Sequence, residues 1–138
     1  MAATKLTAAD AVLAAQAWME LLRAAVLLRT PWRGRLFRDH AMSNAGGRGD
    51  ANRIQHLLNL AGAHHLKPMN CLERSIALRQ LLLRHGIAAE LRIGVRKHGD
   101  QLEGHAWVEA AALAPDPLSA DFRVLQACQT PPKGQCWV

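Results

Sequence analysis

Aromatic residues are scarce in this chain, and several hallmarks of nucleic-acid-binding and membrane proteins are missing. The 138 residues include no tyrosine, two phenylalanines and four tryptophans. Because no stacking aromatics are interleaved with the arginines and no DNA- or RNA-binding motif is present, the sequence predicts no nucleic-acid partner. Apolar runs such as residues 24–28 are far shorter than a membrane span, and the segment around Asp10 lacks the apolar core of a secretory signal. We therefore expect neither a membrane span nor export.

Cysteine is also rare: Cys71, Cys128 and Cys136 make an odd number. Without a secretory signal, free thiols in a reducing cytoplasm are the simplest expectation. Cys128 and Cys136 are separated by seven residues and have no histidine at ligand spacing, so zinc is a weak alternative. We expect no metal ion and no cofactor.

The basic residues are unevenly distributed. The length favours one compact domain, and the net charge is +6. Residues 1–70 contain nine Lys/Arg and four Asp/Glu, whereas residues 71–138 contain eight and seven. The excess includes a cluster formed by Arg23, Arg29, Arg33, Arg35 and Arg38. Such a surface can simply be solvated, or it can face an acidic peptide or partner protein.

Two N-terminal segments have the apolar period of helices. Thr7 is the expected N-cap of the first, with Asp10 placed as in a capping box, and Pro31 follows its end. The second is expected over residues 50–63, after a Gly-rich stretch over residues 43–53 that is typical of a loop.

A third helix and two strands follow. Residues 71–84 have apolar side chains on two adjacent faces, which predicts a mostly buried helix with Gly86 just beyond its end. Residues 88–97 and 102–110 alternate as half-buried strands, with a turn between them.

The C-terminal residues are expected to contribute less regular structure. Residues 113–125 could supply another short strand, and residues 126–138 are Pro/Gly-rich and read as a loop. Helices followed by an antiparallel meander predict an α+β fold, with the long third helix packed on a small antiparallel sheet.

Cys71 stands where the third helix begins. The backbone N–H groups of a helix N-terminus stabilise a thiolate and can bind a developing oxyanion. A free cysteine is also commonly a small buried hydrophobe, so a histidine partner is needed before a nucleophile can be inferred.

His105 is the candidate partner, because it lies in an apolar strand. Trp107 and Glu109 share its face of that strand, where Trp107 can wall a site. Asp116 and Asp121, as well as Glu109, are candidates to orient the imidazole. Packing of the helix across the sheet is expected to bring the cysteine over a central strand, with the histidine on that strand and the acid on the next.

Residues 70–109 read NCLERSIALRQLLLRHGIAAELRIGVRKHGDQLEGHAWVE, an ordered series of motifs around this cysteine and histidine. Over roughly residues 65–125 the chain closely resembles the transglutaminase-like domain of lasso-peptide biosynthesis B proteins, leader peptidases of the microcin-processing type. The shared signature is Cys-Leu-x-Arg-Ser-x-Ala-Leu, His-Gly-Ile, Glu-Leu-Arg-Ile-Gly-Val and His-Ala-Trp-Val-Glu. This series is far more specific than a cysteine and a histidine alone.

The resemblance implies a papain- or transglutaminase-like cysteine peptidase fold with a Cys-His-Asp triad. By position, Cys71 is the nucleophile, His105 the base and Asp116 the acid, with Asp121 as the alternative acid; Asn70 and Trp107 are candidates for the substrate pocket. Residues 1–64 would form a helical region and residues 65–138 the catalytic core of one compact domain.

The resemblance also implies partners. They are a precursor peptide, a small separate protein that recognises its leader, and an ATP-dependent, asparagine-synthetase-like lasso cyclase that receives the freed core. Three alternatives are an acyltransferase or a transglutaminase with the same triad, and a non-catalytic peptide-binding or scaffold module on the same fold.

Overall fold

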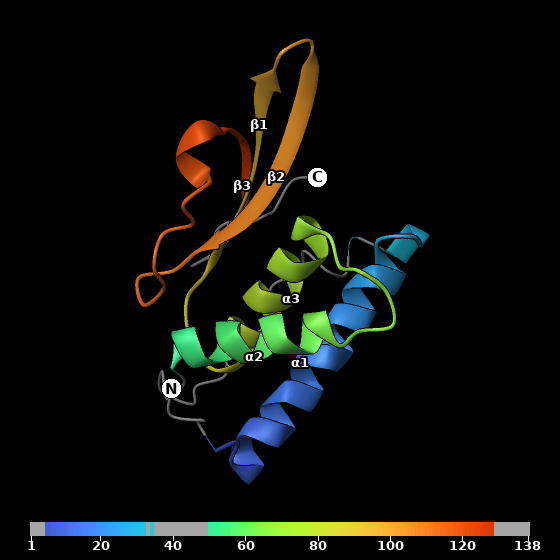
Figure 1. Ribbon diagram of the computed structural model, residues 1–138, viewed down its shortest axis with the longest axis vertical. Coiled ribbons are helices and arrows are strands. Elements are labelled where there is room, and N and C mark those ends of the chain that lie inside the picture. The colour runs from blue at the N-terminus through green and yellow to red at the C-terminus, as the bar shows by residue number, and fades with distance from the viewer. Residues whose placement is uncertain (1–4, 33, 35–49, 129–138) are drawn as a thin grey trace.

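The computed structural model describes residues 5–32, 34 and 50–128 of the chain (Figure 1). Arg33, Arg35 and Arg38 of the arginine cluster, residues 43–49 and Cys136 lie outside the described residues. The described elements are α1 (Ala8–Leu27), α2 (Ala51–Ala63), α3 (Cys71–Arg84), β1 (Glu90–His98), β2 (Gln101–Glu109), the short 3-10 helix η2 (Ser119–Asp121) and β3 (Arg123–Cys128). The predicted α+β class is confirmed.

The first two helices begin at the predicted residues because polar side chains satisfy their first N–H groups. Thr7 accepts a hydrogen bond from the backbone N–H of Asp10, and the Asp10 carboxylate accepts one from the backbone N–H of Thr7 at 2.8 Å. This reciprocal pair is the capping box expected from the sequence. Asp50 caps α2 by accepting from the N–H of Asn52 at 3.0 Å.

Helix α3 is capped at both ends. Asn70 and Glu73 form a second capping box at its start. At its end Gly86 has a φ of 74°, and the N–H of Ile87 donates to the carbonyl of Leu82 at 2.8 Å. A left-handed glycine followed by this long-range bond is the Schellman motif, which closes a helix. Most side chains of α3 are buried, as the width of its apolar surface predicts.

The described sheet has three antiparallel strands in the order β2-β1-β3. The central strand is therefore β1, and the histidine strand β2 lies at an edge of the described sheet; the expectation of a central histidine strand was wrong. Residues 113–125 were expected to supply a strand and residues 126–138 a loop, but β3 begins only at Arg123 and continues to Cys128.

The helices form one layer and the sheet another, with the β1–β2 hairpin projecting beyond the helices (Figure 1). Helix α1 packs on α2 and α3, and α3 also packs on the sheet, where its main contact is with β2. The core draws on all three helices and the first two strands, including Leu21, Ile54, Leu82, Leu91 and Val108. Because α3 is held between the other helices and the sheet, its first residue has a defined position beside β2.

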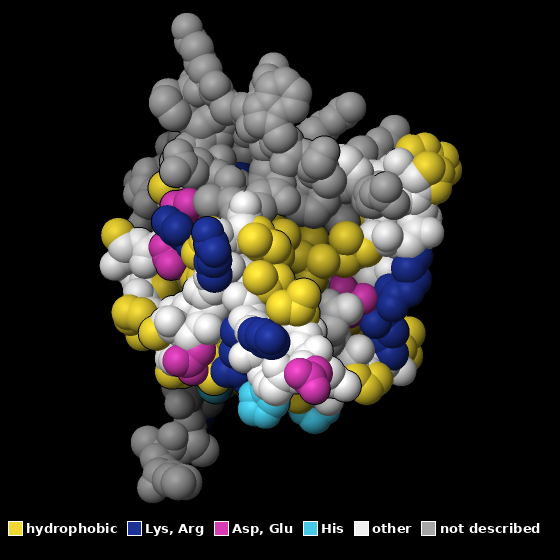
Figure 2. All heavy atoms as spheres, turned by 90° about the horizontal axis from the view of Figure 1, so that it is seen from above, with side chains coloured by type: hydrophobic (Ala, Val, Ile, Leu, Met, Phe, Trp, Pro, Cys, Tyr) yellow, Lys and Arg dark blue, Asp and Glu magenta, His cyan; other side chains and the backbone are white. Residues whose placement is uncertain are grey.

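From the hairpin end, a patch of hydrophobic side chains is bordered by Lys and Arg side chains (Figure 2). None of the described helices combines the length and the apolar character that crossing a membrane requires.

Candidate active site

Cys71 is the first residue of α3 and is half-buried. Its position depends on Glu73, two residues later, whose carboxylate accepts from the backbone N–H of Asn70 while Asn70 Oδ1 accepts from the N–H of Glu73 at 2.8 Å. The Glu73 carboxylate also contacts Lys67 at 3.0 Å and Arg29 at 3.1 Å. The start of α3 is thus connected to both the preceding loop and the end of α1.

The Glu73 side chain is only 1% exposed and remains a carboxylate in this network. Burial by itself raises the pKa of the Glu73 carboxyl. Hydrogen bonds from Lys67, from the backbone of Asn70 and from Arg29 outweigh that effect, so the pKa of Glu73 lies below its usual value. The charge that fixes the helix start is therefore present at neutral pH.

His105 and Asp116 form a hydrogen-bonded pair. Nε2 of His105 lies 3.0 Å from Oδ2 of Asp116. A carboxylate only accepts hydrogen bonds, so Nε2 is the donor to Asp116; in the neutral imidazole, Nδ1 is then the nitrogen that keeps its lone pair. Asp116 Oδ1 accepts from the backbone N–H of Leu118 at 2.8 Å, and Ser119 Oγ donates to the Asp116 carbonyl at 2.7 Å. Each carboxylate oxygen of Asp116 thus accepts one hydrogen bond, Oδ2 from His105 and Oδ1 from Leu118.

Two aromatic rings pack against the imidazole of His105. The ring of Trp107, on the same strand, is stacked at a centroid distance of 5.7 Å, and the ring of Phe122 lies at 5.1 Å. Trp107 is 3% exposed and donates its indole N–H to Glu109 at 3.1 Å. The two neighbouring rings and the carboxylate on Nε2 restrict the orientation of His105.

A buried hydrogen bond joins the helix of Cys71 to the strand of His105. Ser75 Oγ donates to the carbonyl of Ala106 at 3.0 Å. Ser75 is four residues after Cys71 on α3, and Ala106 directly follows His105 on β2. This hydrogen bond holds α3 against β2 close to Cys71 and His105.

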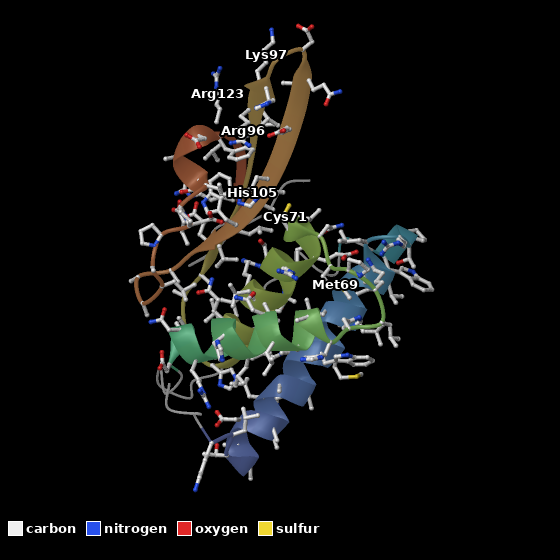
Figure 3. All side chains as sticks on the ribbon, in the orientation of Figure 1. Met69, Cys71, Arg96, Lys97, His105 and Arg123 are labelled. Atoms are coloured by element: carbon white, nitrogen blue, oxygen red, sulfur yellow. The ribbon has the colours of Figure 1, made fainter. Side chains whose placement is uncertain are left out.

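These side chains surround one cleft of about 490 Å³ between α2, α3, β2 and the loop after β2. Cys71, His105, Trp107 and Asp116 all line it. Figure 3 shows Cys71 at the upper end of α3, just below His105. A thiol, an imidazole and a carboxylate around one cleft are the groups that covalent catalysis by a cysteine uses.

The other residues singled out from the sequence lie elsewhere. The Asp121 side chain is 66% exposed, with its carboxylate 3.7 Å from Arg96. Glu109 contacts Trp107 and Arg92 rather than His105. Asn70 is the helix cap and is not among the residues that line the cleft, whereas Trp107 lines it. The acid was expected on the strand next to that of the histidine, but Asp116 lies in the loop that follows β2.

Several contributors escaped the sequence reasoning. Phe122 contacts the imidazole, yet it immediately precedes a strand whose pairing partner cannot be read from periodicity. Ser75 follows Cys71 by one helical turn, a spacing that places both on one face, and this is the signal that could have identified it. Gly94 pairs with His105 across the sheet; a Cβ there would lie 3.0 Å from the Trp107 ring.

Comparison with known proteins gives one family. The model of the transglutaminase-like superfamily matches residues 7–127. The chain belongs to the transglutaminase-like superfamily. No significant match to a curated protein or to a solved structure was found. The match covers every described helix and reaches into β3, so the fold is α+β with a transglutaminase-like core.

Members of this superfamily are generally cysteine hydrolases or transferases. Among the described residues, no group of three or more His, Cys, Asp or Glu side chains is placed to hold a metal ion. Cys128 ends β3, and Cys136, its counterpart in the weak zinc alternative, lies outside the described residues.

Proposed function

We propose that this chain is a cysteine peptidase that removes the leader peptide from a lasso-peptide precursor before the core is cyclised. The observation that carries the proposal is the single cleft lined by Cys71 at a helix start and by the His105–Asp116 pair at 3.0 Å. The ordered motifs from Cys71 to Glu109 support the choice of leader peptides over other substrates of the superfamily.

In this proposal Asp116 holds His105 in the tautomer with Nδ1 unprotonated, and Nδ1 takes the proton of Cys71. The thiolate Sγ attacks the carbonyl carbon of the leader–core bond and forms a tetrahedral intermediate. The backbone N–H of Cys71, one of the unpaired donors of the first helical turn, binds the oxyanion.

His105 then donates its proton to the leaving amine, which frees the core and leaves the leader as a thioester on Cys71. A water molecule loses a proton to His105 and attacks the thioester carbon. Collapse of the second intermediate releases the leader carboxylic acid and, with return of the proton, the Cys71 thiol. The net reaction adds one water to one peptide bond.

The proposed partners follow the same reasoning. A precursor peptide is cut, a separate recognition protein presents its leader, and an asparagine-synthetase-like, ATP-dependent cyclase receives the freed core. All of these would operate in the cytoplasm, where the thiol of Cys71 is kept reduced.

The test is cleavage of the candidate precursor, with and without its recognition protein, followed by mass spectrometry in water enriched in oxygen-18. We expect the wild-type chain to release leader and core, with one heavy oxygen in the new leader carboxylate. Cys71→Ala and His105→Ala should each lower the rate by at least about 10³-fold. Asp121→Asn, at an exposed carboxylate outside the cleft, is the matched control and should retain activity.

Two results would contradict the proposal. Transfer of the leader acyl group to an added amine in preference to water would identify an acyltransferase or transglutaminase instead. Full activity of Cys71→Ala and His105→Ala in precursor maturation would identify a non-catalytic binding module.

A further inference from the structure

One charged residue of the cleft, Arg74, has no partner in the part of the chain that the structure describes. Arg74 lines the cleft and is exposed, and its side chain makes no hydrogen bond or ion pair with any residue in the described part of the chain. The other arginines of α3 differ in this respect: Arg84 pairs with Glu20, and Arg79 is buried and has a partner. Fold stability therefore gives no evident reason for a cation at position 74.

The position of the Arg74 guanidinium is nevertheless defined. A Cβ built on Gly62 of α2 would lie 3.6 Å from Nε and 3.7 Å from one terminal nitrogen of Arg74. The guanidinium thus lies beside α2 at a point where the helix has no side chain. Asn59 and Gln55, one and two turns before Gly62, line the same cleft, and neither side chain is hydrogen-bonded to a described residue.

Among the described residues that line the cleft, the one carboxylate is Asp116, and its two oxygens accept from His105 and Leu118 rather than from Arg74. Glu73 precedes Arg74 in sequence but turns to Lys67 and Arg29. Arg74 is therefore a guanidinium donor that no described residue engages, in a cleft that two neutral amides also line, and this set of groups suits a carboxylate.

We infer that Arg74 determines specificity in this cleft by binding the carboxylate of an acidic residue of the substrate peptide near the scissile bond. Arg74 is three residues after Cys71, a spacing that puts the two Cβ atoms about 5–6 Å apart on one helix face. An extended peptide advances about 3.3 Å per residue, so the acidic residue lies within about two positions of the bond that Cys71 attacks.

This inference rests on the proposed peptidase activity and names the kind of substrate that the same site selects. It gives Arg74 a role in substrate selection. Replacing Arg74 leaves the nucleophile and the base in place. A guanidinium this close to Cys71 also favours the thiolate, so a general loss of rate should be equal for the Asp, Asn and Lys peptides, whereas the loss of substrate binding should be confined to the Asp peptide.

The test uses peptides that span the leader–core junction of the precursor, with Asp, Asn or Lys placed in turn at each of the three positions on either side of the bond. For the wild-type chain, Asp at one position should raise kcat/KM roughly 10- to 100-fold over Asn, the range typical of a hydrogen bond to a charged group. Arg74→Gln should abolish this preference. Arg74→Glu should reverse it, so that the Lys peptide at that position becomes the best substrate.

Two controls isolate the effect. Arg123→Gln removes the same charge from an exposed arginine of β3 outside this cleft, and it should keep the acidic preference. Alkylation of Cys71 by neutral iodoacetamide, followed by peptide mapping, measures the general loss of thiolate reactivity in Arg74→Gln, which should be the same for every peptide and so leave the comparison between peptides unaffected.

The outcomes are distinguishable. If cleavage depends on Cys71 but no position shows an acidic preference, or if the preference survives in Arg74→Gln, the inference about Arg74 is wrong and the peptidase proposal stands. If no peptide is cleaved in a Cys71-dependent way, the peptidase proposal is wrong and the inference falls with it.

Discussion

Replacing Gly94 with alanine tests how the histidine strand is packed. Gly94 lies on the central strand opposite His105 and at the irregularity between β1 and β3. A Cβ at this position would lie 3.0 Å from the Arg123 carbonyl oxygen, 3.0 Å from the Trp107 ring and 3.1 Å from Cβ of Phe122. The φ of Gly94 is not positive, so the cost of a side chain is steric rather than conformational.

The neighbours cannot all move away. One contact is to backbone, another is to a ring that is 3% exposed, and the third is to a residue packed against that ring. Insertion of a methyl group into such a site typically costs about 1–3 kcal/mol. For a chain of this length that corresponds to a fall in Tm of roughly 4–12 °C. The Trp107 ring stacks on His105, so the imidazole should also shift, and activity should fall by roughly tenfold or more.

Gly104→Ala is the matched control. Gly104 is on the neighbouring strand, and a Cβ there meets nothing within 4 Å. Its replacement should leave Tm unchanged or raise it slightly, because alanine restricts the unfolded chain. Thermal unfolding followed by circular dichroism, together with the precursor cleavage assay, measures both effects. A Tm for Gly94→Ala equal to that of the wild type, or an equal fall for both variants, would refute this steric reasoning.

Three further predictions concern groups around the cleft. Asp116→Asn should lower kcat by roughly 10²- to 10⁴-fold, because the amide can hold the wrong tautomer of His105, whereas Asp121→Asn should stay near wild type; similar losses in both would exclude Asp116 as the orienting acid. Glu73→Gln keeps the helix cap but loses the charge, and should destabilise the fold by about 1–3 kcal/mol at pH 7. Because the pKa of Glu73 is lowered in the folded state, its stabilising contribution is fully present above the ordinary pKa of about 4.3 and is lost as the pH falls through the folded-state pKa. Urea unfolding should therefore show that the difference in unfolding free energy between wild type and Glu73→Gln narrows below about pH 4; a difference that does not change with pH would contradict the prediction. Ser75→Ala removes the donor to the Ala106 carbonyl and should lower the free energy of unfolding by about 1–3 kcal/mol. If the hydrogen bond aligns Cys71 with His105, kcat should fall by a larger factor than KM changes; an unchanged kcat would argue against that role.

Local features of the fold were predictable because their causes lie within a few residues. The capping box of Thr7 with Asp10, the cap at Asp50 and the left-handed Gly86 each satisfy backbone groups of the adjacent turn. The first two strands were predictable from alternation in the sequence, although burial along β2 does not alternate: Ala106, Trp107 and Val108 are consecutive and all buried. These patterns also placed Cys71 at the start of a helix, where Asn70 and Glu73, both within one turn of it, form the capping box.

The third strand was less predictable. Residues 113–125 contain two prolines and a short apolar segment, and their periodicity does not distinguish a strand from a turn. Pairing with β1 decides that β3 begins at Arg123, and β1 thereby becomes the central strand. Which distant strands pair depends on the whole sheet, so it cannot be predicted from the residue pattern of one segment.

The sequence by itself determined the α+β class, the three helices, the hairpin and the two candidate reactive residues, Cys71 and His105. Tertiary structure alone decided which carboxylate meets the imidazole. Asp116 and Asp121 are 11 and 16 residues beyond His105, and only the turn after β2 brings the first to 3.0 Å while the second faces Arg96. It also decided that Arg74 pairs with no residue in the described ranges, because the absence of an ion pair depends on everything that surrounds a side chain.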